Sequence, residues 1–221
     1  MMTKKIPISI ALFAVLLACS AVMTHAQQPY PKVEVFGGYS LEYLGLPSDQ
    51  LDALKTALVD LGATSVSTSK WLKEGFATSF TYNVTKTLGI EGDVRWNRGN
   101  IVNTQIAGVA ASVRYTDLPV LFGPRFAFRG NSAVTPFVHV LFGLDHASIG
   151  GSGSANGQSL SVGGPSSNGF GLVAGGGLDV KVSKVIAIRV VQADYYYSRV
   201  YSTNLNNFAL AFGAVFRFGG K

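Results

Sequence analysis

The chain has 221 residues, of which 48% are hydrophobic and 14% are charged, and its formal net charge is +6. No lysine or arginine cluster accompanies this mild basic excess, so the composition does not indicate a nucleic-acid-binding protein. Only one cysteine is present, which excludes a framework of intramolecular disulfides.

The N-terminal segment is typical of a secretory signal peptide. Lys4 and Lys5 give it a basic start, residues 6–22 form an uncharged apolar run, and Thr24-His25-Ala26 offers small residues for cleavage. We therefore predict export, with cleavage after Ala26. The mature chain would then have about 195 residues, which suits one domain.

Two other interpretations of this segment remain open. The first is a membrane-spanning helix, although the uncharged run is near the lower length limit for crossing a bilayer. The second is a lipoprotein site at Leu16-Leu17-Ala18-Cys19, in which Cys19 would be acylated. We expect a signal peptide over residues 1–26 and one folded domain over residues 27–221.

The rest of the chain repeats an alternation of large apolar residues with small or polar ones, the period of a β-strand. Eight such segments of about 9–12 residues follow one another, a length that crosses a bilayer when tilted. They begin near Val33, Phe76, Leu88, Val120, Val138, Phe170, Ile186 and Phe208. No stretch after Ala26 approaches the about 18 consecutive apolar residues of a spanning helix, so strands would have to make any crossing.

The last segment shows the pattern most clearly. One of its faces is large and apolar, whereas the other holds small residues and Arg217. An apolar outside and a small or polar inside are typical of membrane barrels. The alternative is a soluble, lipocalin-like periplasmic barrel, which predicts polar outer faces and fits this segment poorly.

Connections of two lengths alternate between the segments. Short turns lie at Thr85-Lys86, 130–133 and 181–184, long ones at 44–70, 98–117 and 148–168, and a medium one at 199–206. This alternation is typical of outer-membrane barrels. The sequence therefore predicts an all-β fold, an eight-stranded antiparallel transmembrane β-barrel with short periplasmic turns and long extracellular loops.

The long connections carry weaker signals of their own. Residues 48–61 have helical spacing and predict a short helix within the first long loop. Residues 104–115 could be a further strand, but we interpret them as an extended hairpin or an ordered loop. The Gly/Ser-rich residues 150–154 predict a flexible loop tip.

Acidic and basic side chains gather on the small-residue face of the strands. Gln192 and Asp194 have the opposite parity, and we expect a β-bulge at Val190-Val191 to turn them inward. Because a buried charge needs a partner, we predict a network of charges in the lumen. Its members are Glu34, Glu91, Asp93, Arg95, Arg125, Arg129, Asp145, Asp179, Arg189, Asp194 and Arg217, and Glu42 shares their face.

Aromatic residues cluster near the predicted strand ends. Such residues fit girdles at the membrane interface, where an amphipathic ring lies at the level of the headgroups. They are Tyr39, Tyr43, Trp71, Trp96, Tyr195, Tyr196, Tyr197 and Tyr201.

Three stretches resemble small bacterial outer-membrane β-barrel proteins, in particular the transmembrane domain of outer-membrane protein A and similar porin-like barrels. They are residues 32–40 (KVEVFGGYS), residues 122–126 (FGPRF), and the end from Gly175 to Phe218. The resemblance covers nearly the whole mature chain. It implies residence in the outer membrane, contact with lipid and lipopolysaccharide, and assembly by the barrel-assembly machinery.

The machinery reads a terminal aromatic in this family, although here Gly219-Gly220-Lys221 follow the last one. The resemblance implies that the assembly signal consists of Phe208, Leu210, Phe212, Phe216 and Phe218.

Enzymatic and metal-binding sites have little support. Some small barrels are lipid A deacylases with a His-x-Ser pair and a nearby glutamate. His146-Ala147-Ser148 offers the pair, but Glu91 is the last glutamate of the chain and Asp179 has inward parity. His139 and His146 lie on opposite faces, which disfavours a metal site. We therefore expect no enzyme, no metal and no cofactor.

Two classes of function remain. The first is a structural or surface-interaction barrel with a plugged polar lumen, whose segments 44–70, 98–117 and 148–168 would meet a surface ligand. The plug is favoured because an eight-stranded barrel is just wide enough for side chains to fill. The second is a small porin that passes ions or small polar solutes, and a lipid A-modifying enzyme is a minor alternative.

Overall fold

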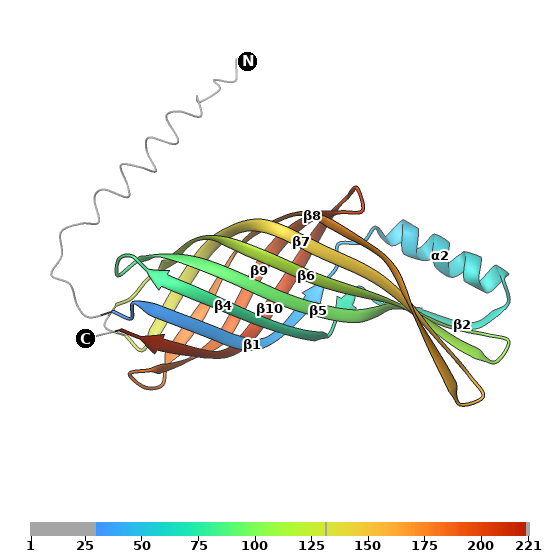
Figure 1. The fold of residues 1–221 in the computed structure, drawn as a ribbon, viewed down its shortest axis with the longest axis horizontal. Coiled ribbons are helices and arrows are strands. Elements are labelled where there is room, and N and C mark those ends of the chain that lie inside the picture. Colours follow the sequence, from blue (N-terminus) through green and yellow to red (C-terminus); the bar gives the residue numbers. More distant parts are fainter. Residues whose placement is uncertain (1–29, 131, 220–221) are drawn as a thin grey trace, which may run out of the picture.

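The computed structural model describes residues 30–130 and 132–219. The expected signal peptide, including Cys19, lies outside these residues. Eight of the described strands form a ring in which each strand is antiparallel to the next and β10 pairs back with β1 (Figure 1). They are β1 (Val33–Tyr43), β4 (Glu74–Asn83), β5 (Leu88–Ile106), β6 (Val109–Ala127), β7 (Val134–Ala155), β8 (Gln158–Lys181), β9 (Ile186–Val200) and β10 (Thr203–Phe218).

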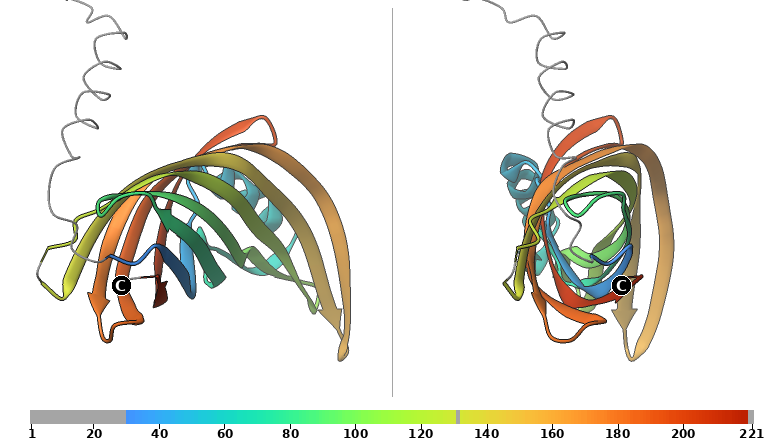
Figure 2. Two further views of the ribbon diagram at one scale, coloured as in Figure 1. Left: turned by 60° about the vertical axis from the view of Figure 1, so that its left-hand side comes forward. Right: turned by 90° about the vertical axis from the view of Figure 1, so that its left-hand side faces the viewer.

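This ring confirms the predicted eight-stranded antiparallel barrel. The closing pair runs in register from Val33 opposite Phe218 to Tyr43 opposite Phe208. Figure 2, in its right-hand view, looks nearly along the barrel and shows the ring. Because the sheet closes on itself, its strands have no unpaired edge, so every backbone N–H and C=O in the ring can find a partner.

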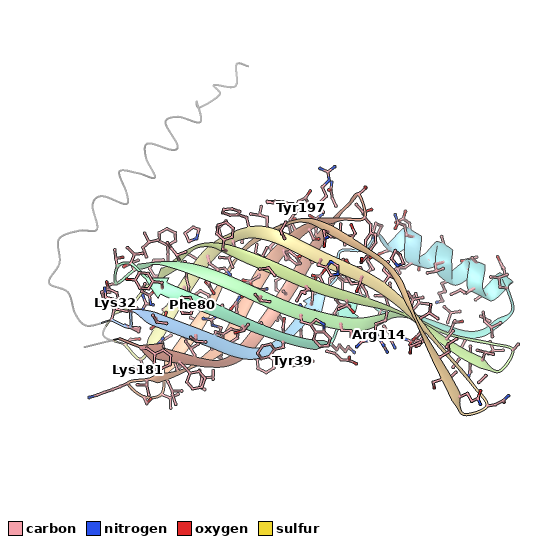
Figure 3. All side chains as sticks on the ribbon, viewed as in Figure 1. Lys32, Tyr39, Phe80, Arg114, Lys181 and Tyr197 are labelled. Atoms are coloured by element: carbon pink, nitrogen blue, oxygen red, sulfur yellow. The ribbon has the colours of Figure 1, made fainter. Side chains whose placement is uncertain are left out.

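The alternation along each strand separates an apolar outside from a polar inside. Large side chains such as Phe80, Phe122 and Phe212 are about half exposed on the outer face, whereas the residues between them are buried. Figure 3 shows Tyr39 and Phe80 on the outside of the barrel, and Lys32 and Lys181 at the end where the described chain begins, at Tyr30, and stops, at Gly219, two points that we refer to below as its termini. None of the described helices is long and apolar enough to span a membrane.

The structure corrects the prediction of loops at residues 98–117 and 148–168. These residues continue β5 to β8 well beyond the ring as two hairpins with tight turns at Ala107-Gly108 and Asn156-Gly157, where all four residues have positive φ. Residues 104–115 therefore form the end of an extended hairpin. The Gly/Ser-rich residues 150–154 lie within β7 and are not a loop tip.

The reason for the error lies in the environment of these segments. Outside an apolar layer, both faces of a hairpin can be polar, so the alternation that marks a strand disappears from the sequence. Pairing with the neighbouring strand still satisfies the backbone, and turns with positive φ at both central residues suit the twist of a hairpin. β9 and β10 are likewise joined by a tight turn, at Tyr201-Ser202.

The first long connection contains the predicted helix. α2 covers Ser48–Asp60 and ends before Gly62, whose φ of +88° suits a residue without a Cβ. It leads into β2 (Ala63–Thr68), which pairs with the extended part of β5, and then β3 (Trp71–Leu72), which pairs with β1. The first long connection is therefore hydrogen-bonded to two strands of the ring, β5 through β2 and β1 through β3.

The expected aromatic girdle needs one correction. Tyr43 and Trp71 contact each other edge to face with their ring centres 5.2 Å apart, and Tyr195 is exposed. Tyr196, however, is only 2% exposed and points into the barrel. Consecutive residues of a strand face opposite sides, so Tyr195-Tyr196-Tyr197 cannot all lie in one girdle.

The apolar exterior yields a prediction about insertion. Replacing Leu210, on the outer face of β10, by arginine (Leu210→Arg) should impair folding into lipid vesicles, because an arginine near the bilayer midplane costs about 2–4 kcal/mol. The folded fraction is measured by the gel shift between heated and unheated samples. Leu160→Arg is the matched control, because Leu160 is exposed on the hairpin beyond the ring. Equal folding of both variants would contradict an apolar surface that faces lipid.

Candidate functional site in the barrel lumen

The inward face of the barrel carries nearly all of the predicted charge network. Ten of its eleven members are buried, and Arg129 is partly exposed. The bulge predicted at Val190-Val191 is confirmed, because Asp179 pairs with Arg189 while Leu178 pairs with Val191.

Glu34 forms the centre of the layer nearest the termini. Its Oε1 accepts from Arg217 Nε at 3.0 Å, and its Oε2 accepts from Arg129 Nη2 at 2.6 Å and from Arg125 Nη1 at 3.3 Å. Asn83 Nδ2 adds a further donor at 3.2 Å. One buried carboxylate therefore neutralises part of the charge of three arginines.

Asp179 binds two arginines in the next layer. Arg189 Nε lies 2.9 Å from its Oδ1 and Arg125 Nη2 lies 2.8 Å from its Oδ2. Both guanidinium groups also stack on Phe137, at 4.0 Å for Arg125 and 4.4 Å for Arg189, and Arg189 lies over Phe36 as well. Aromatic faces thus replace water on the flat sides of these buried cations.

His139 links two carboxylates in the middle of the barrel. Its Nδ1 lies 3.0 Å from Glu91 Oε2, and its Nε2 lies 2.9 Å from Asp194 Oδ1. Asp194 also accepts from Gln192 Nε2 at 2.7 Å and forms an ion pair with Arg95. His139 and Gln192 extend the network beyond the predicted members, and the inward parity of His139 is the sequence signal that would have included it.

Arg95 completes this layer. Its Nε donates to Asp93 Oδ1 at 2.7 Å, in addition to the ion pair with Asp194. Arginine, histidine and carboxylate side chains therefore form layered, interlinked ion pairs from Glu34 up to Asp93, in the space between opposite walls of the barrel.

The layer above contains acids without arginine partners, which corrects the expectation that every inward charge is paired. Among the described residues, Glu42, Asp117 and Asp145 form no ion pair within 4.0 Å. All three are fully buried. The sequence prediction omits Asp117 because it places residue 117 in a loop, whereas the structure places it on β6 with the same parity as Arg125.

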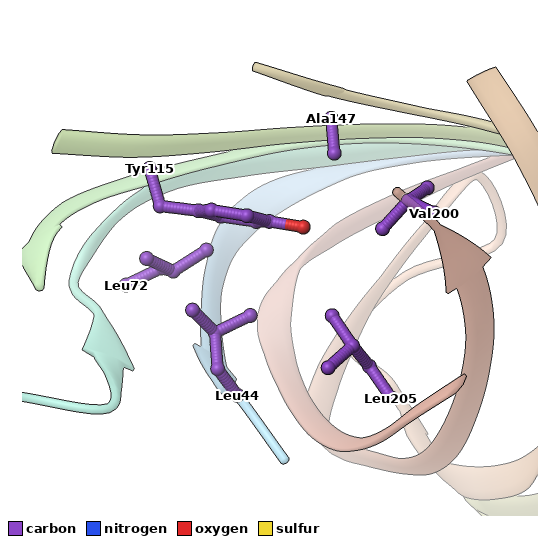
Figure 4. Close-up of a cluster of buried hydrophobic side chains, with 6 residues drawn as sticks. All are labelled: Leu44, Leu72, Tyr115, Ala147, Val200 and Leu205. Carbon is purple, nitrogen blue, oxygen red and sulfur yellow. The ribbon is translucent and has the colours of Figure 1, made fainter. Parts of the chain in front are cut away.

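An apolar cluster closes the barrel above these acids. We call it the cap, and Figure 4 shows its residues converging from four strands of the wall (β6, β7, β9 and β10), from β3 and from the residue that follows β1. They are Leu44, Leu72, Tyr115, Ala147, Val200 and Leu205. Leu46, Ile101, Ile149 and Tyr201 pack against it. The lumen is therefore filled by ion pairs below and covered by apolar side chains at the end far from the termini.

A separate hollow of about 310 Å³ lies among the extended parts of β5 to β8. Two arginines, Arg98 and Arg114, line it together with serine, threonine, glycine and two apolar residues, and none of its lining residues is acidic. Arg114 Nε donates to Asn100 Oδ1 at 3.2 Å, whereas Arg98 Nε is buried without a partner. Figure 3 places Arg114 where the hairpins leave the barrel.

The residues considered for catalysis or metal binding do not come together. His146 Nδ1 lies 2.6 Å from Asn168 Oδ1, across the β7–β8 pair. His146 is exposed, whereas His139 is buried inside the barrel. In the described part of the chain, no group of three or more His, Cys, Asp or Glu residues is arranged to hold a metal ion.

Comparison with known proteins gives one family. Residues 11–218 match the model of the outer membrane protein β-barrel domain. No sequence among curated proteins matches the chain.

Solved structures of small barrels are also similar. Ail, the attachment invasion locus protein of Yersinia pestis, in complex with the heparin analogue sucrose octasulfate, is 19% identical. That match covers 86% of this chain and 99% of Ail with a TM-score of 0.50. OprG of Pseudomonas aeruginosa is 11% identical (88% and 99% covered, TM-score 0.47), and E. coli outer membrane protein W is 14% identical (87% and 100% covered, TM-score 0.42).

The lowest layer of the network predicts unequal costs for two substitutions. Glu34→Gln should lower the free energy of unfolding by about 3 kcal/mol or more, because three arginines, two of them buried, lose their shared carboxylate. Arg217→Ala should cost less, about 1–3 kcal/mol, because Glu34 keeps Arg125 and Arg129. Urea unfolding of the protein in lipid vesicles measures both. A smaller loss for Glu34→Gln than for Arg217→Ala would contradict the central place of this carboxylate.

Proposed function

This chain belongs to the outer-membrane β-barrel domain family, and from that premise we propose that it is a closed barrel with a structural and surface-interaction role. Its place is the bacterial outer membrane, where lipid and lipopolysaccharide surround the apolar exterior. The cap carries the proposal. Six apolar side chains cover the end of the barrel opposite the termini, and ion pairs occupy the lumen below them.

The proposed surface role rests on the part of the chain beyond the ring. Two long hairpins, α2 and β2 extend from the same end of the barrel (Figure 1). They include the three segments proposed to meet a surface ligand, 44–70, 98–117 and 148–168. Paired strands hold this surface in a fixed shape, which lowers the ordering cost of binding.

The arginine-lined hollow suggests anionic groups as the ligand. Arginine binds phosphate and sulfate through parallel N–H donors, and Arg98 has a buried Nε that no group of the chain satisfies. Ail has been solved in complex with a sulfated saccharide analogue, which makes a sulfated or phosphorylated glycan the first ligand to test here.

Other expectations from the sequence remain part of the proposal. We infer a signal peptide over residues 1–26, a mature barrel domain over 27–221, and an assembly signal in β10 that the barrel-assembly machinery reads. The apolar residues of that signal face outward between Phe208 and Phe218. No catalytic role is proposed, because His146 bonds to an asparagine and no glutamate follows Glu91 in the sequence.

Channel recording tests the closed lumen against the alternative of a small porin. Mature protein inserted in a planar bilayer should give no discrete openings at neutral pH. The protein is delivered to the bilayer by fusion of lipid vesicles, and protease protection of those vesicles confirms insertion. The double variant Leu44→Ala/Leu205→Ala, which removes apolar volume from the cap, should raise the frequency of openings. Reproducible openings of the wild-type protein at neutral pH would favour the porin.

The anion-binding surface is tested with arginine-to-alanine variants inside and outside the hollow. Arg98→Ala/Arg114→Ala should elute from a heparin column at lower salt than the wild type, because it loses two donors from one hollow. Arg199→Ala is the control, since Arg199 is exposed on β9 and does not line the hollow. If Arg199→Ala alone lowers retention as much as the double variant, net charge and not the hollow explains binding.

A further inference from the structure

The distribution of charge inside the barrel is uneven. From Glu34 to Arg95, five buried or partly buried arginines face five carboxylates, and all of them take part in ion pairs. The layer under the cap has three carboxylates, those of Glu42, Asp117 and Asp145, and none of them pairs with a cation. Each is 0% exposed, so water cannot screen their repulsion.

Hydrogen bonding in this layer is incomplete as well. Glu42 accepts from Asn97 Nδ2 and Asn207 Nδ2, both at 2.9 Å, and Asp145 accepts from Ser198 Oγ. Neither oxygen of Asp117 receives an N–H or hydroxyl donor from a described residue, and Asp145 Oδ1 lacks one too. Asp117 lies opposite Asn97, which donates to Glu42, and opposite Ala147, two residues from Asp145, so the register of the strands brings the three carboxyls into one layer.

Among the described residues, no lysine, arginine or histidine nitrogen lies within 4.0 Å of the three carboxylates. Arg95 from β5, Tyr115 from β6 and Tyr196 from β9 are among the titratable side chains around them. The Arg95 guanidinium already binds Asp93 and Asp194 in the layer below. The hydroxyls of Tyr115 and Tyr196 are themselves buried without a hydrogen-bond partner.

Three ionised carboxylates in contact and out of water would repel one another strongly. Two carboxyl groups that share one site resolve this by keeping a proton between them. The described acids are not arranged to hold a metal ion. A proton on Asp117 would also supply the missing donor, because a protonated carboxyl can donate to its neighbour.

We propose that Glu42 and Asp117 bind protons beside the Asp145 carboxylate, whose Oδ1 lacks a donor, and that this site locks the barrel mouth shut. Shared protons tie the β1, β6 and β7 walls together through carboxyl–carboxyl hydrogen bonds. Each acid lies two residues from a member of the cap on its own strand or at its end, namely Leu44, Tyr115 and Ala147. Loss of the protons at higher pH would push these three walls apart and loosen the cap, which makes the barrel a pH-sensitive closure.

The sign of the effect on stability follows from proton linkage. The folded protein holds protons that the unfolded carboxyls release above their ordinary range near pH 4. The contribution of this site to stability is therefore greatest at low pH and falls as the pH rises, with the unfolding constant increasing about tenfold per pH unit for each proton held. The arginine-paired carboxylates have the opposite effect. Acid protonates them and breaks their ion pairs, so their contribution to stability falls at low pH.

Asp117→Asn tests the site, because the amide is neutral and keeps a donor of nearly the same shape. Urea unfolding in vesicles between roughly pH 4 and 9 should show wild-type stability falling with pH, whereas Asp117→Asn should have a flatter profile and exceed the wild type at high pH. Asp179→Asn is the control, because Asp179 binds Arg125 and Arg189. Asp179→Asn should have a lower free energy of unfolding than the wild type, and above about pH 6 that free energy should fall with pH as steeply as in the wild type.

Two readouts keep the proposal testable if the variant folds poorly. Infrared spectra of folded wild-type protein at pH 7 should contain the C=O band of protonated carboxyl groups, and channel openings of the wild type should become more frequent as the pH rises. Parallel stability profiles of wild type and Asp117→Asn would overturn the proposal, as would the absence of that band. If added Ca²⁺ or Mg²⁺ stabilises the wild type but not Asp117→Asn, the site binds a divalent cation and the proposal of bound protons is wrong.

Discussion

Closure of one sheet into a ring is the constraint on which the rest of this structure depends. When β10 pairs with β1, the backbone hydrogen bonds of eight strands are satisfied without an edge, and each residue is assigned to the lipid side or the lumen. With eight strands the enclosed space has the width of facing side chains. Most of the ion pairs of the lumen therefore join different strands, which are often far apart in the sequence.

The lumen meets this requirement in three different ways. Near the termini, guanidinium groups are shared among carboxylates and stacked on aromatic rings, as around Arg125 and Phe137. In the middle, a histidine joins two acids. Beneath the cap lie three acids that have no cationic partner among the described residues, and the apolar side chains of the cap lie above them. A buried ion pair is weak evidence for stability. The change along the barrel axis, from paired charges near the termini to unpaired acids under the cap, therefore indicates that the lumen charges have a role besides filling the barrel.

Much of this was predictable, and the errors have physical causes. The alternation of residues gave the ring strands, and a parity conflict at Val190-Val191 gave the bulge that turns Gln192 and Asp194 inward. The extensions of β5 to β8 were missed because outside lipid both faces of a hairpin can be polar. The prediction of a loop at residues 98–117 also explains why Asp117 is absent from the predicted charge network. The prediction that Tyr196 belongs to the aromatic girdle is wrong because it follows residue type, whereas the alternation along β9 turns this side chain into the barrel.

The sequence by itself determined the number of strands in the ring and which face of each of them is apolar, because these are local patterns of period two. The tertiary structure alone decided which charges meet. Partners such as Glu34 and Arg217, or His139 and Asp194, are separated by many tens of residues, and their distances depend on the register and stagger of the closed ring. The contrast between compensated and uncompensated layers of the lumen is therefore visible only after the ring has closed.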